Sequence, residues 1–363
     1  MKKRNSNIII YTASALLLIL SLSLSACGGK NGNNQAATET EISSSNKTIS
    51  ITDMAGRKVN IPSEINKISC IHPIPSHMVW RLAPKKLASI DNQFKDRLFF
   101  MKDEEVKRLT SLPITGTFNT GDMSREQMLT IKPDIIISLK KDTNLDKEQK
   151  DYSAPVVAAS KDSLSDYEES WRLIGKLVGN EKEGNELADY WHKTIAKVTD
   201  NTSKIPENEK LKVYYAQSDI NKTVGTKSIM ASIIRDAGGI NLYDTISISK
   251  ADEQNESITA SMEQILKFDP DVIIAKTSGA RDEILSNPQW ESINAVKNKR
   301  VYASLKYEML DRIQSLMGLV WTANTLYPDK VNLDINKEVK TFYSKVYLYD
   351  NITDAQIHEE ITK

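Results

Sequence analysis

The sequence predicts an α/β fold of two Rossmann-like lobes joined by one long α-helix, with a ligand cleft between the lobes. The first observation behind this prediction is a fifteen-residue stretch that occurs twice, at 124–138 (SREQMLTIKPDIIIS) and 261–275 (SMEQILKFDPDVIIA), with identity at eight positions. The second is a helical periodicity of apolar residues between the copies, from residue 163 to about 199. The copies lie 137 residues apart, too far for a solenoid repeat, so they predict two separate lobes.

Each copy of the repeat encodes a short helix followed by a strand. Ser124 and Ser261 stand three residues before Gln127 and Gln264, the spacing at which an N-cap hydroxyl and an N3 side chain satisfy each other's backbone N–H groups. A proline later in each copy predicts the end of the helix, because the residue before a proline is pushed out of the α region. The apolar β-branched runs that follow are typical of strands buried on both faces.

The front of the chain is predicted to be a lipoprotein signal peptide over residues 1–26. Three basic residues at positions 2–4 precede an apolar run over 8–24, and small residues lead into Cys27. This order resembles a bacterial lipobox, in which Cys27 receives a diacylglyceryl group and becomes the first residue. The alternative is an uncleaved membrane anchor, and both readings put the body of the protein outside the cytoplasmic membrane. Residues 27–47 are polar and predict a disordered tether with a reach of about 25 Å.

Charge and cysteine content narrow the class of protein. The 363 residues hold 48 basic and 48 acidic side chains. Without residues 1–26, which contain no acid, 45 basic and 48 acidic side chains are left, and this balance argues against a nucleic-acid binder. With Cys27 lipidated, Cys70 has no cysteine partner, so we expect no intramolecular disulfide. Cys70 lies in an apolar run and is most simply a small buried hydrophobe.

The first lobe is predicted over 48–162. Its expected strands lie at 49–52, 58–61, 67–71, 87–90, 135–137 and 155–159. The third strand runs into a loop over 72–78, ahead of a helix that begins at residue 79, and such strand-to-helix loops are where open α/β sheets bind ligands. Histidine is the commonest protein metal ligand, and His or Met can ligate haem iron. The alternative is that a loop histidine caps the next helix. The ligand-contact candidates in this lobe are His72, Ser76, His77, Met78 and Phe118.

The connector is predicted over 163–203 and the second lobe, with helices at its C-terminal end, over 204–363. A helix of roughly 35 residues spans about 50 Å and would limit movement of the lobes, although Gly179-Asn180 is a place where it could bend. The second-lobe candidates lie on or after two predicted strands, at 211–216 and 300–303. Arg and Tyr suit an anionic, catecholate or hydroxamate iron chelate, and the alternative for each is a surface ion pair. These candidates are Tyr215, Gln217, Thr226, Tyr307 and Arg312.

Several motifs in order carry a family resemblance. They are the lipobox, ITDMAGRKVNIP, the two repeat copies, the long helix, QWESINAVKNKRVYA and GLVWTANTLYPDK. Over about 48–360 the chain resembles the lipoprotein substrate-binding components of ABC importers for iron–siderophore, haem and cobalamin. The resemblance implies a small hinge movement, and it implies that Glu126 and Glu263 pair with arginines of the permease. The alternative is that an acid in a helix's first turn complements the helix dipole, worth about 0.3–1 kcal/mol.

The function expected from these observations is capture and delivery without catalysis. We expect a monomer, held at the cell membrane by its lipid, that binds an iron(III)-siderophore-type chelate and hands it to an ABC permease with its ATPase. No cofactor and no nucleic acid are expected. The stretch LKYEMLDRIQ departs from the family pattern, which leaves haem or cobalamin open as the ligand. A sensor or adhesin on the same fold is the rival from another class. An enzyme is disfavoured because no zinc-peptidase, phosphate-loop or nucleophile-elbow motif is present.

Overall fold

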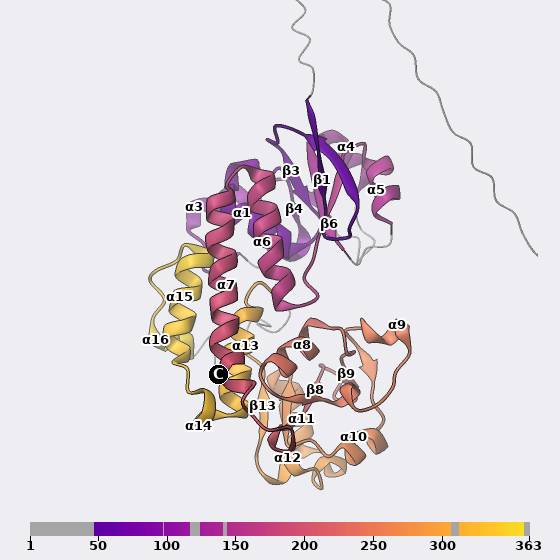
Figure 1. The fold of residues 1–363 in the computed structure, drawn as a ribbon, viewed down its shortest axis with the longest axis vertical. Coiled ribbons are helices and arrows are strands. Elements are labelled where there is room, and N and C mark those ends of the chain that lie inside the picture. Colours follow the sequence, from indigo (N-terminus) through magenta and orange to yellow (C-terminus); the bar gives the residue numbers. More distant parts are fainter. Residues whose placement is uncertain (1–46, 97, 117–123, 141–143, 306–311, 359–363) are drawn as a thin grey trace, which may run out of the picture. The chain divides into compact units, whose positions relative to one another are not determined.

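The computed structural model describes residues 47–96, 98–116, 124–140, 144–305 and 312–358. The chain divides into two units, residues 1–45 and residues 46–363, and the second unit holds all the described elements (Figure 1). The predicted signal peptide, Cys27 and nearly all of the predicted tether lie outside the described residues. Among the described helices, none combines the length and the apolar character needed to cross a membrane.

The first lobe is built around a parallel sheet with strand order β3-β6-β7. Leu87 bridges to Ile68 of β3, and the short parallel pair β4-β5 and the antiparallel hairpin β1-β2 complete the lobe. Its strands are β1 (Thr48–Thr52), β2 (Lys58–Pro62), β3 (Ile68–Cys70), β4 (Ile90–Asp91), β5 (Ile114–Thr115), β6 (Ile135–Leu139) and β7 (Val156–Ala159). Its helices are α1 (Pro73–Leu82), α2 (Asn92–Lys95), α3 (Asp103–Thr110), α4 (Arg125–Ile131) and α5 (Leu145–Tyr152), with a 3-10 turn at Pro84–Lys86.

The second lobe is built around a parallel sheet with strand order β10-β8-β12-β13. Its strands are β8 (Lys212–Ala216), β9 (Lys222–Thr223), β10 (Ile240–Asn241), β11 (Ile258–Thr259), β12 (Val272–Ala275) and β13 (Val301–Ala303). Its helices are α8 (Ile229–Asp236), α9 (Lys250–Glu253), α10 (Met262–Phe268), α11 (Ser278–Ser286) and α12 (Asn294–Lys297), with 3-10 turns at Glu207–Glu209, Leu242–Asp244 and Pro288–Trp290. The C-terminal helices are α13 (Ser315–Leu326), α14 (Pro328–Val331), α15 (Ile335–Tyr347) and α16 (Asp354–Gln356).

The two repeat copies form α4–β6 in the first lobe and α10–β12 in the second. The hydroxyls of Ser124 and Ser261 accept hydrogen bonds from the backbone N–H groups of Gln127 and Gln264, each at 3.2 Å. In the second copy the Gln264 side chain also accepts from the Ser261 backbone at 2.9 Å, which completes the predicted capping box. Both helices end on a residue in the left-handed conformation, directly before the proline.

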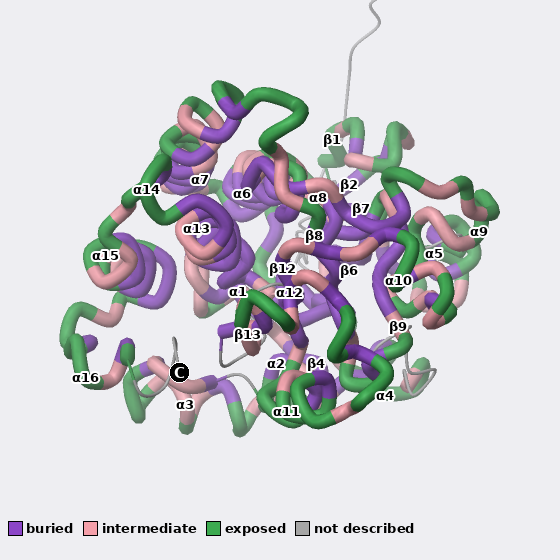
Figure 2. Tube along the Cα trace, turned by 90° about the horizontal axis from the view of Figure 1, so that it is seen from below, coloured by how far each residue is buried: buried purple, intermediate pink, exposed green. Residues whose placement is uncertain are grey.

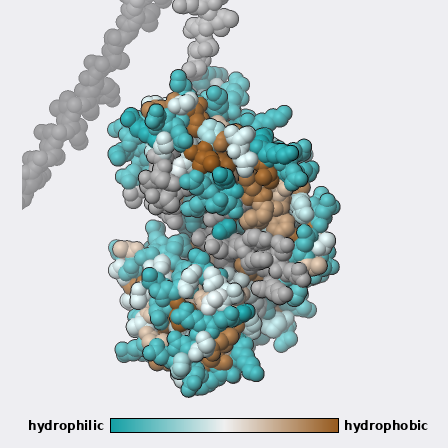
Figure 3. Space-filling model, turned by 180° about the vertical axis from the view of Figure 1, so that it is seen from behind, coloured by the Kyte–Doolittle hydropathy of each residue, from teal (hydrophilic) through white to brown (hydrophobic). Residues whose placement is uncertain are grey.

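The repeated strands hold the same place in both sheets. β6 lies between β3 and β7, and β12 lies between β8 and β13, and every residue of β6 and β12 is buried (Figure 2). The carboxylate of Asp134 accepts a hydrogen bond from the backbone of Lys67 at 2.8 Å, and that of Asp271 accepts from Lys212 at 2.9 Å. Each aspartate therefore fastens its strand to the start of the neighbouring one. The prediction of two similar α/β lobes is confirmed, and the surface is hollowed between them (Figure 3).

The segment predicted as one helix forms two helices packed against each other. α6 (Leu164–Val178) and α7 (Glu181–Thr202) meet at Gly179, whose φ of 74° ends α6 in the left-handed region. The helices approach closely because Gly184 carries no side chain: a Cβ there would lie 2.7 Å from the carbonyl oxygen of Trp171. The prediction of a single helix of roughly 35 residues is therefore wrong. One long helix does link the lobes, since α7 with 22 residues spans about 33 Å (Figure 1).

The C-terminal helix α15 returns to the first lobe. The guanidinium of Arg81 in α1 donates to the carbonyl of Lys345 at 2.6 Å, and His77 contacts the carbonyl of Val346 at 3.2 Å. The predicted lobe boundaries at residues 162 and 204 stay a prediction. α15 was assigned to the second lobe, but it packs against α1 of the first lobe.

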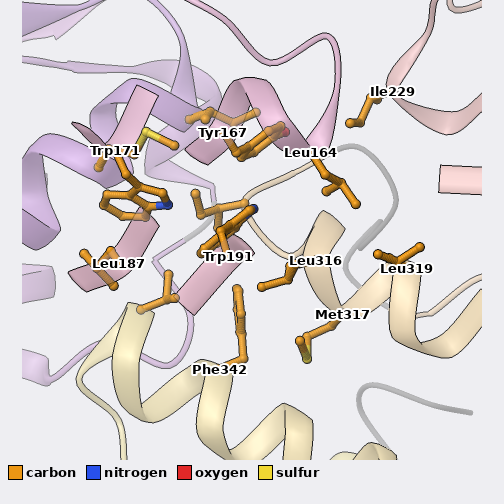
Figure 4. Close-up of a cluster of buried hydrophobic side chains, with 14 of the residues drawn as sticks. Leu164, Tyr167, Trp171, Leu187, Trp191, Ile229, Leu316, Met317, Leu319 and Phe342 are labelled. Carbon is orange, nitrogen blue, oxygen red and sulfur yellow. The ribbon is translucent and has the colours of Figure 1, made fainter. Parts of the chain in front are cut away.

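One hydrophobic core runs through the connection between the lobes (Figure 4). The ring of Trp191 in α7 lies 5.7 Å from that of Trp171 in α6 and 5.9 Å from that of Phe342 in α15. Leu164 at the start of α6 belongs to the same cluster as Leu319 of α13. Because such interiors are close-packed, this core resists large relative movement of the lobes.

Candidate functional site

Residues that follow strands of the first lobe meet residues that follow strands of the second. Two contacts between the lobes indicate this arrangement. Residues that follow β3 and residues that precede α13 line one small cavity. In the other contact, Lys161, two residues after β7, lies 3.9 Å from Glu256 of the second lobe. The hollow between the lobes is the candidate ligand site, at the position where open α/β sheets bind ligands.

The first contact is closed by packing. Its cavity measures about 10 Å³, which is too small for a metal chelate. The side-chain amide of Gln314 donates to the hydroxyl of Tyr347 at 2.6 Å and fixes the end of α15 against the start of α13. The cavity is lined by Pro73, Ile74, His77, Phe94, Arg312, Ile313, Gln314 and Tyr347.

The second contact brings charge into the candidate site. Lys161 is 5% exposed, and its ammonium is paired across the lobes with the carboxylate of Glu256. The side-chain amide of Gln217, directly after β8, donates to the backbone carbonyl of Glu256. A buried ammonium keeps its charge only when it is paired, so this position suits a negatively charged ligand. Lys161 could have been found from the sequence as a ligand-site candidate, because it lies just after the end of a predicted strand.

The loop that carries Glu256 is held close to the start of α8. The backbone N–H groups of Gly225 and Lys227 donate to the carbonyls of Asn255 and Glu253 at 2.8 and 2.6 Å. A Cβ on Gly225 would lie 2.1 Å from the carbonyl oxygen of Asp252, so this approach requires glycine. Thr226, a predicted ligand contact, therefore lies beside this loop, and the structure brings Gln217, Thr226 and the loop together.

His72 caps α1 and does not lie in a free loop. The helix begins at Pro73, six residues before the predicted start, and Nδ1 of His72 accepts a hydrogen bond from the backbone N–H of Ile74 at 3.3 Å. Proline at the first helical position is favourable because its missing N–H has no partner there in any case. The capping alternative for His72 is thus the one that the structure supports.

The other three candidates of α1 lie inside the first lobe. The ring of His77 packs 5.1 Å from Trp80 and 4.5 Å from Tyr347, and burial lowers its pKa to about 3. The hydroxyl of Ser76 donates to Asp91 at 2.9 Å, and Met78 is fully buried. These side chains offer a ligand no surface in this structure, because the predicted loop is helical and its side chains pack inward.

The remaining candidates divide into two groups. Tyr215 is buried in β8, whereas Arg312 is half-buried and borders the first contact. Phe118 and Tyr307 lie outside the described residues. Across the described ranges, no group of three or more His, Cys, Asp or Glu side chains could hold a metal ion. Cys70 is fully buried, as expected, and burial raises the pKa of its thiol.

Glu126 and Glu263 are exposed at the second position of α4 and α10. Within the described part of the chain, neither carboxylate is recorded in an ion pair. Glu263 also borders an open surface groove of about 790 Å³, which Lys267 and Phe268 help to line. In two views α4 and α10 lie on one side of residues 46–363, away from α15 (Figures 1 and 2). This placement keeps both carboxylates free to meet a partner.

Comparison with known proteins decides the family. The periplasmic binding protein family model matches residues 84–306, more than half of the chain. This chain belongs to the periplasmic binding protein family. The family resemblance predicted from the ordered motifs is thereby confirmed.

This periplasmic binding protein resembles relatives with different stated ligands. It is 24% identical to the molybdate-binding protein MolA of Haemophilus influenzae over 328 residues, or 82% of this chain and 90% of MolA. It is 26% identical to the Fe(3+)-citrate-binding protein YfmC of Bacillus subtilis over 211 residues, or 55% and 63% of the two chains. An ABC transporter solute binding protein from Sulfurospirillum deleyianum matches in structure with a TM-score of 0.70 and 25% identity, covering 85% and 97%.

Proposed function

We propose that this periplasmic binding protein is the extracytoplasmic lipoprotein of an ABC importer, and that it captures an iron(III) chelate between its lobes. Cys27 supplies the lipid anchor, residues 27–47 the tether, and the folded body works as a monomer without a cofactor. The observation that carries the proposal is the meeting of residues that follow strands of the two lobes, with the buried Lys161 at one contact.

Lys161 and Arg312 favour an anionic ligand. Citrate and catecholate chelates of iron(III) carry negative charge, which basic groups attract and orient. The ammonium of Lys161 and the carboxylate of Glu256 lie 3.9 Å apart. In the proposed complex a ligand anion takes the place of the Glu256 carboxylate beside the ammonium.

A tetrahedral oxyanion such as molybdate is the second candidate ligand. The observation in its favour is that the likeness to MolA extends over 90% of that protein, against 63% of YfmC. The same basic groups would attract it. An oxyanion is far smaller than a siderophore chelate, so it would require a tighter closure of the lobes.

Calorimetric titration separates the two ligands. Residues 46–363 form their own compact unit, so the chain can be purified from residue 46 onward and titrated with ferric citrate, a ferric hydroxamate, haem, cobalamin and molybdate. The proposal predicts a dissociation constant below about 10 μM for a ferric chelate. Binding of molybdate alone would replace iron by an oxyanion as the cargo. Failure of all five compounds would refute capture of these ligands.

We assign delivery to Glu126 and Glu263. The permease of an ABC importer presents two equivalent subunits to the binding protein, and one exposed carboxylate on each lobe can meet one basic residue on each subunit. Charge pairs of this kind mainly set the rate and the register of encounter. A sensor or adhesin on the same fold would give the two glutamates no such role.

A further inference from the structure

Large apolar side chains are exposed at few places in the described part of the chain. They are Ile49, Leu129, Leu266, Leu285 and Leu348. Two of them, Leu129 and Leu266, occupy the same position in the two repeat copies, as the sixth residue of each. Their exposed fractions are similar, 37% and 43%. A single exposed leucine needs no explanation, but the same exposure at equivalent positions of two lobes does.

Each of these leucines stands three residues after a docking glutamate. Residues three apart lie on one face of a helix, so Glu126 and Leu129 are neighbours on α4, and Glu263 and Leu266 are neighbours on α10. The residues just before the leucines, Met128 and Ile265, are fully buried and fix each helix to its lobe. Each lobe thus presents one carboxylate and one isobutyl group side by side on a short, firmly seated helix.

We propose that Leu129 and Leu266 are paired apolar anchors for the two subunits of the importer's permease. Each leucine enters an apolar pocket next to the basic residue that meets Glu126 or Glu263. The inference rests on the proposed delivery function. The occupant is argued from symmetry and charge: the pair of sites repeats once per lobe, both helices lie on one side of the unit (Figures 1 and 2), and each site combines negative charge with apolar surface.

Acid and leucine have different parts in this contact. Exposed charge pairs accelerate association and lose strength in salt. A leucine that a polar rim shields from water slows dissociation, and its contribution to binding does not depend on the salt concentration. The glutamates therefore govern how fast the complex forms, and the leucines govern how long it lasts.

The test measures binding to nanodiscs that hold the permease–ATPase complex required for uptake, at 50 and 500 mM salt. The chain is used from residue 46 onward, as a compact unit without its lipid. We expect Leu129→Ala and Leu266→Ala each to raise the dissociation constant about tenfold, mainly through faster dissociation and equally at both salt concentrations. We expect Glu126→Gln with Glu263→Gln to slow association and to flatten the salt dependence.

Leu348→Ala is the matched control, because Leu348 is 49% exposed at the end of α15, on the other side of the unit. It should bind as the wild type does, and all variants should keep the ligand affinity of the wild type. If the glutamate variant loses binding while Leu129→Ala and Leu266→Ala do not, delivery stands and the anchors are refuted. If neither the glutamate variant nor the leucine variants bind the permease nanodiscs more weakly than the wild type, the delivery proposal itself fails. If the leucine variants lose an affinity for nanodiscs without permease, the leucines contact lipid and the inference is overturned.

Discussion

His77 is a neutral histidine held inside the first lobe. Burial lowers its pKa to about 3, against an ordinary value of 6.5. The unfolded chain therefore binds a proton that the folded chain does not, between pH 6.5 and about 3. Stability attributable to His77 is complete above pH 6.5 and falls as the pH falls through this window, by about 1.4 kcal/mol per pH unit.

Replacing this histidine should remove that pH dependence. Between pH 7 and pH 5 we expect the wild type to lose about 2 kcal/mol more of its free energy of unfolding than His77→Gln does. Urea denaturation at the two pH values measures the difference. Equal losses in both proteins would mean that the pKa of His77 is the same in the folded and the unfolded chain.

Lys161 and Glu256 should affect ligand affinity in opposite directions. Lys161→Met removes the buried positive charge and should weaken binding of an anionic ligand about tenfold. Glu256→Gln removes the competing carboxylate and should strengthen it. Lys340→Met, which breaks the pair with Asp354 far from the candidate site, is the control. If calorimetry gives all three variants the ligand affinity of the wild type, Lys161 does not belong to the ligand site.

The sequence predicts local side-chain roles at this scale better than ligand contacts. The bonds of Ser124 and Ser261 follow from spacing alone, because a cap requires only nearby backbone groups. The place of His77 could not be predicted in this way, since its neighbours Trp80, Phe94 and Tyr347 include one that is 270 residues away. Lys161 was missed although its position after a strand is the same kind of signal as that of Gln217.

At the scale of elements, the crossing of α6 and α7 depends on two glycines. A Cβ on Gly184 would lie 2.7 Å from a carbonyl oxygen of α6 and 2.8 Å from the Cα of Gly175. Gly184→Ala should therefore lower the free energy of unfolding by about 1–3 kcal/mol, although alanine is the better helix former.

Gly279→Ala is the control for that substitution. Gly279 lies in α11, where an added Cβ meets its nearest atom at 3.9 Å, so this variant should be as stable as the wild type or up to about 1 kcal/mol more stable. Urea denaturation compares the two. If Gly184→Ala were as stable as the wild type, the contact between α6 and α7 would be able to accommodate a methyl group.

The helix predictions that were wrong were wrong in where a helix begins or ends. The periodicity over 163–199 is continuous because both helices face the same core, and a turn at Gly179 does not interrupt it. The segment predicted as a loop over 72–78 begins α1 instead, because proline is well accommodated in the first turn of a helix.

At the scale of the whole molecule, the repeat predicts the architecture because the two copies build the central strand of each sheet. The return of α15 to the first lobe could not be predicted, since an amphipathic helix shows which face it buries but not against which lobe. Glu126 and Glu263 stand at the same position of the duplicated segment, and their recurrence was accessible from the sequence for that reason.

In the proposed function, one acidic group on each lobe docks the loaded protein on a two-fold symmetric permease. Glu126→Lys with Glu263→Lys reverses both charges. Glu104→Lys with Asp329→Lys is the matched control, because these acids are exposed at the second position of α3 and α14.

The most direct measurement is uptake of the labelled ligand by cells that carry each variant, together with the ligand affinity of the purified protein. We expect the Glu126 and Glu263 double variant to lose uptake and to keep its affinity, while the control keeps both. Wild-type uptake by the double variant would show that the two glutamates have no part in delivery.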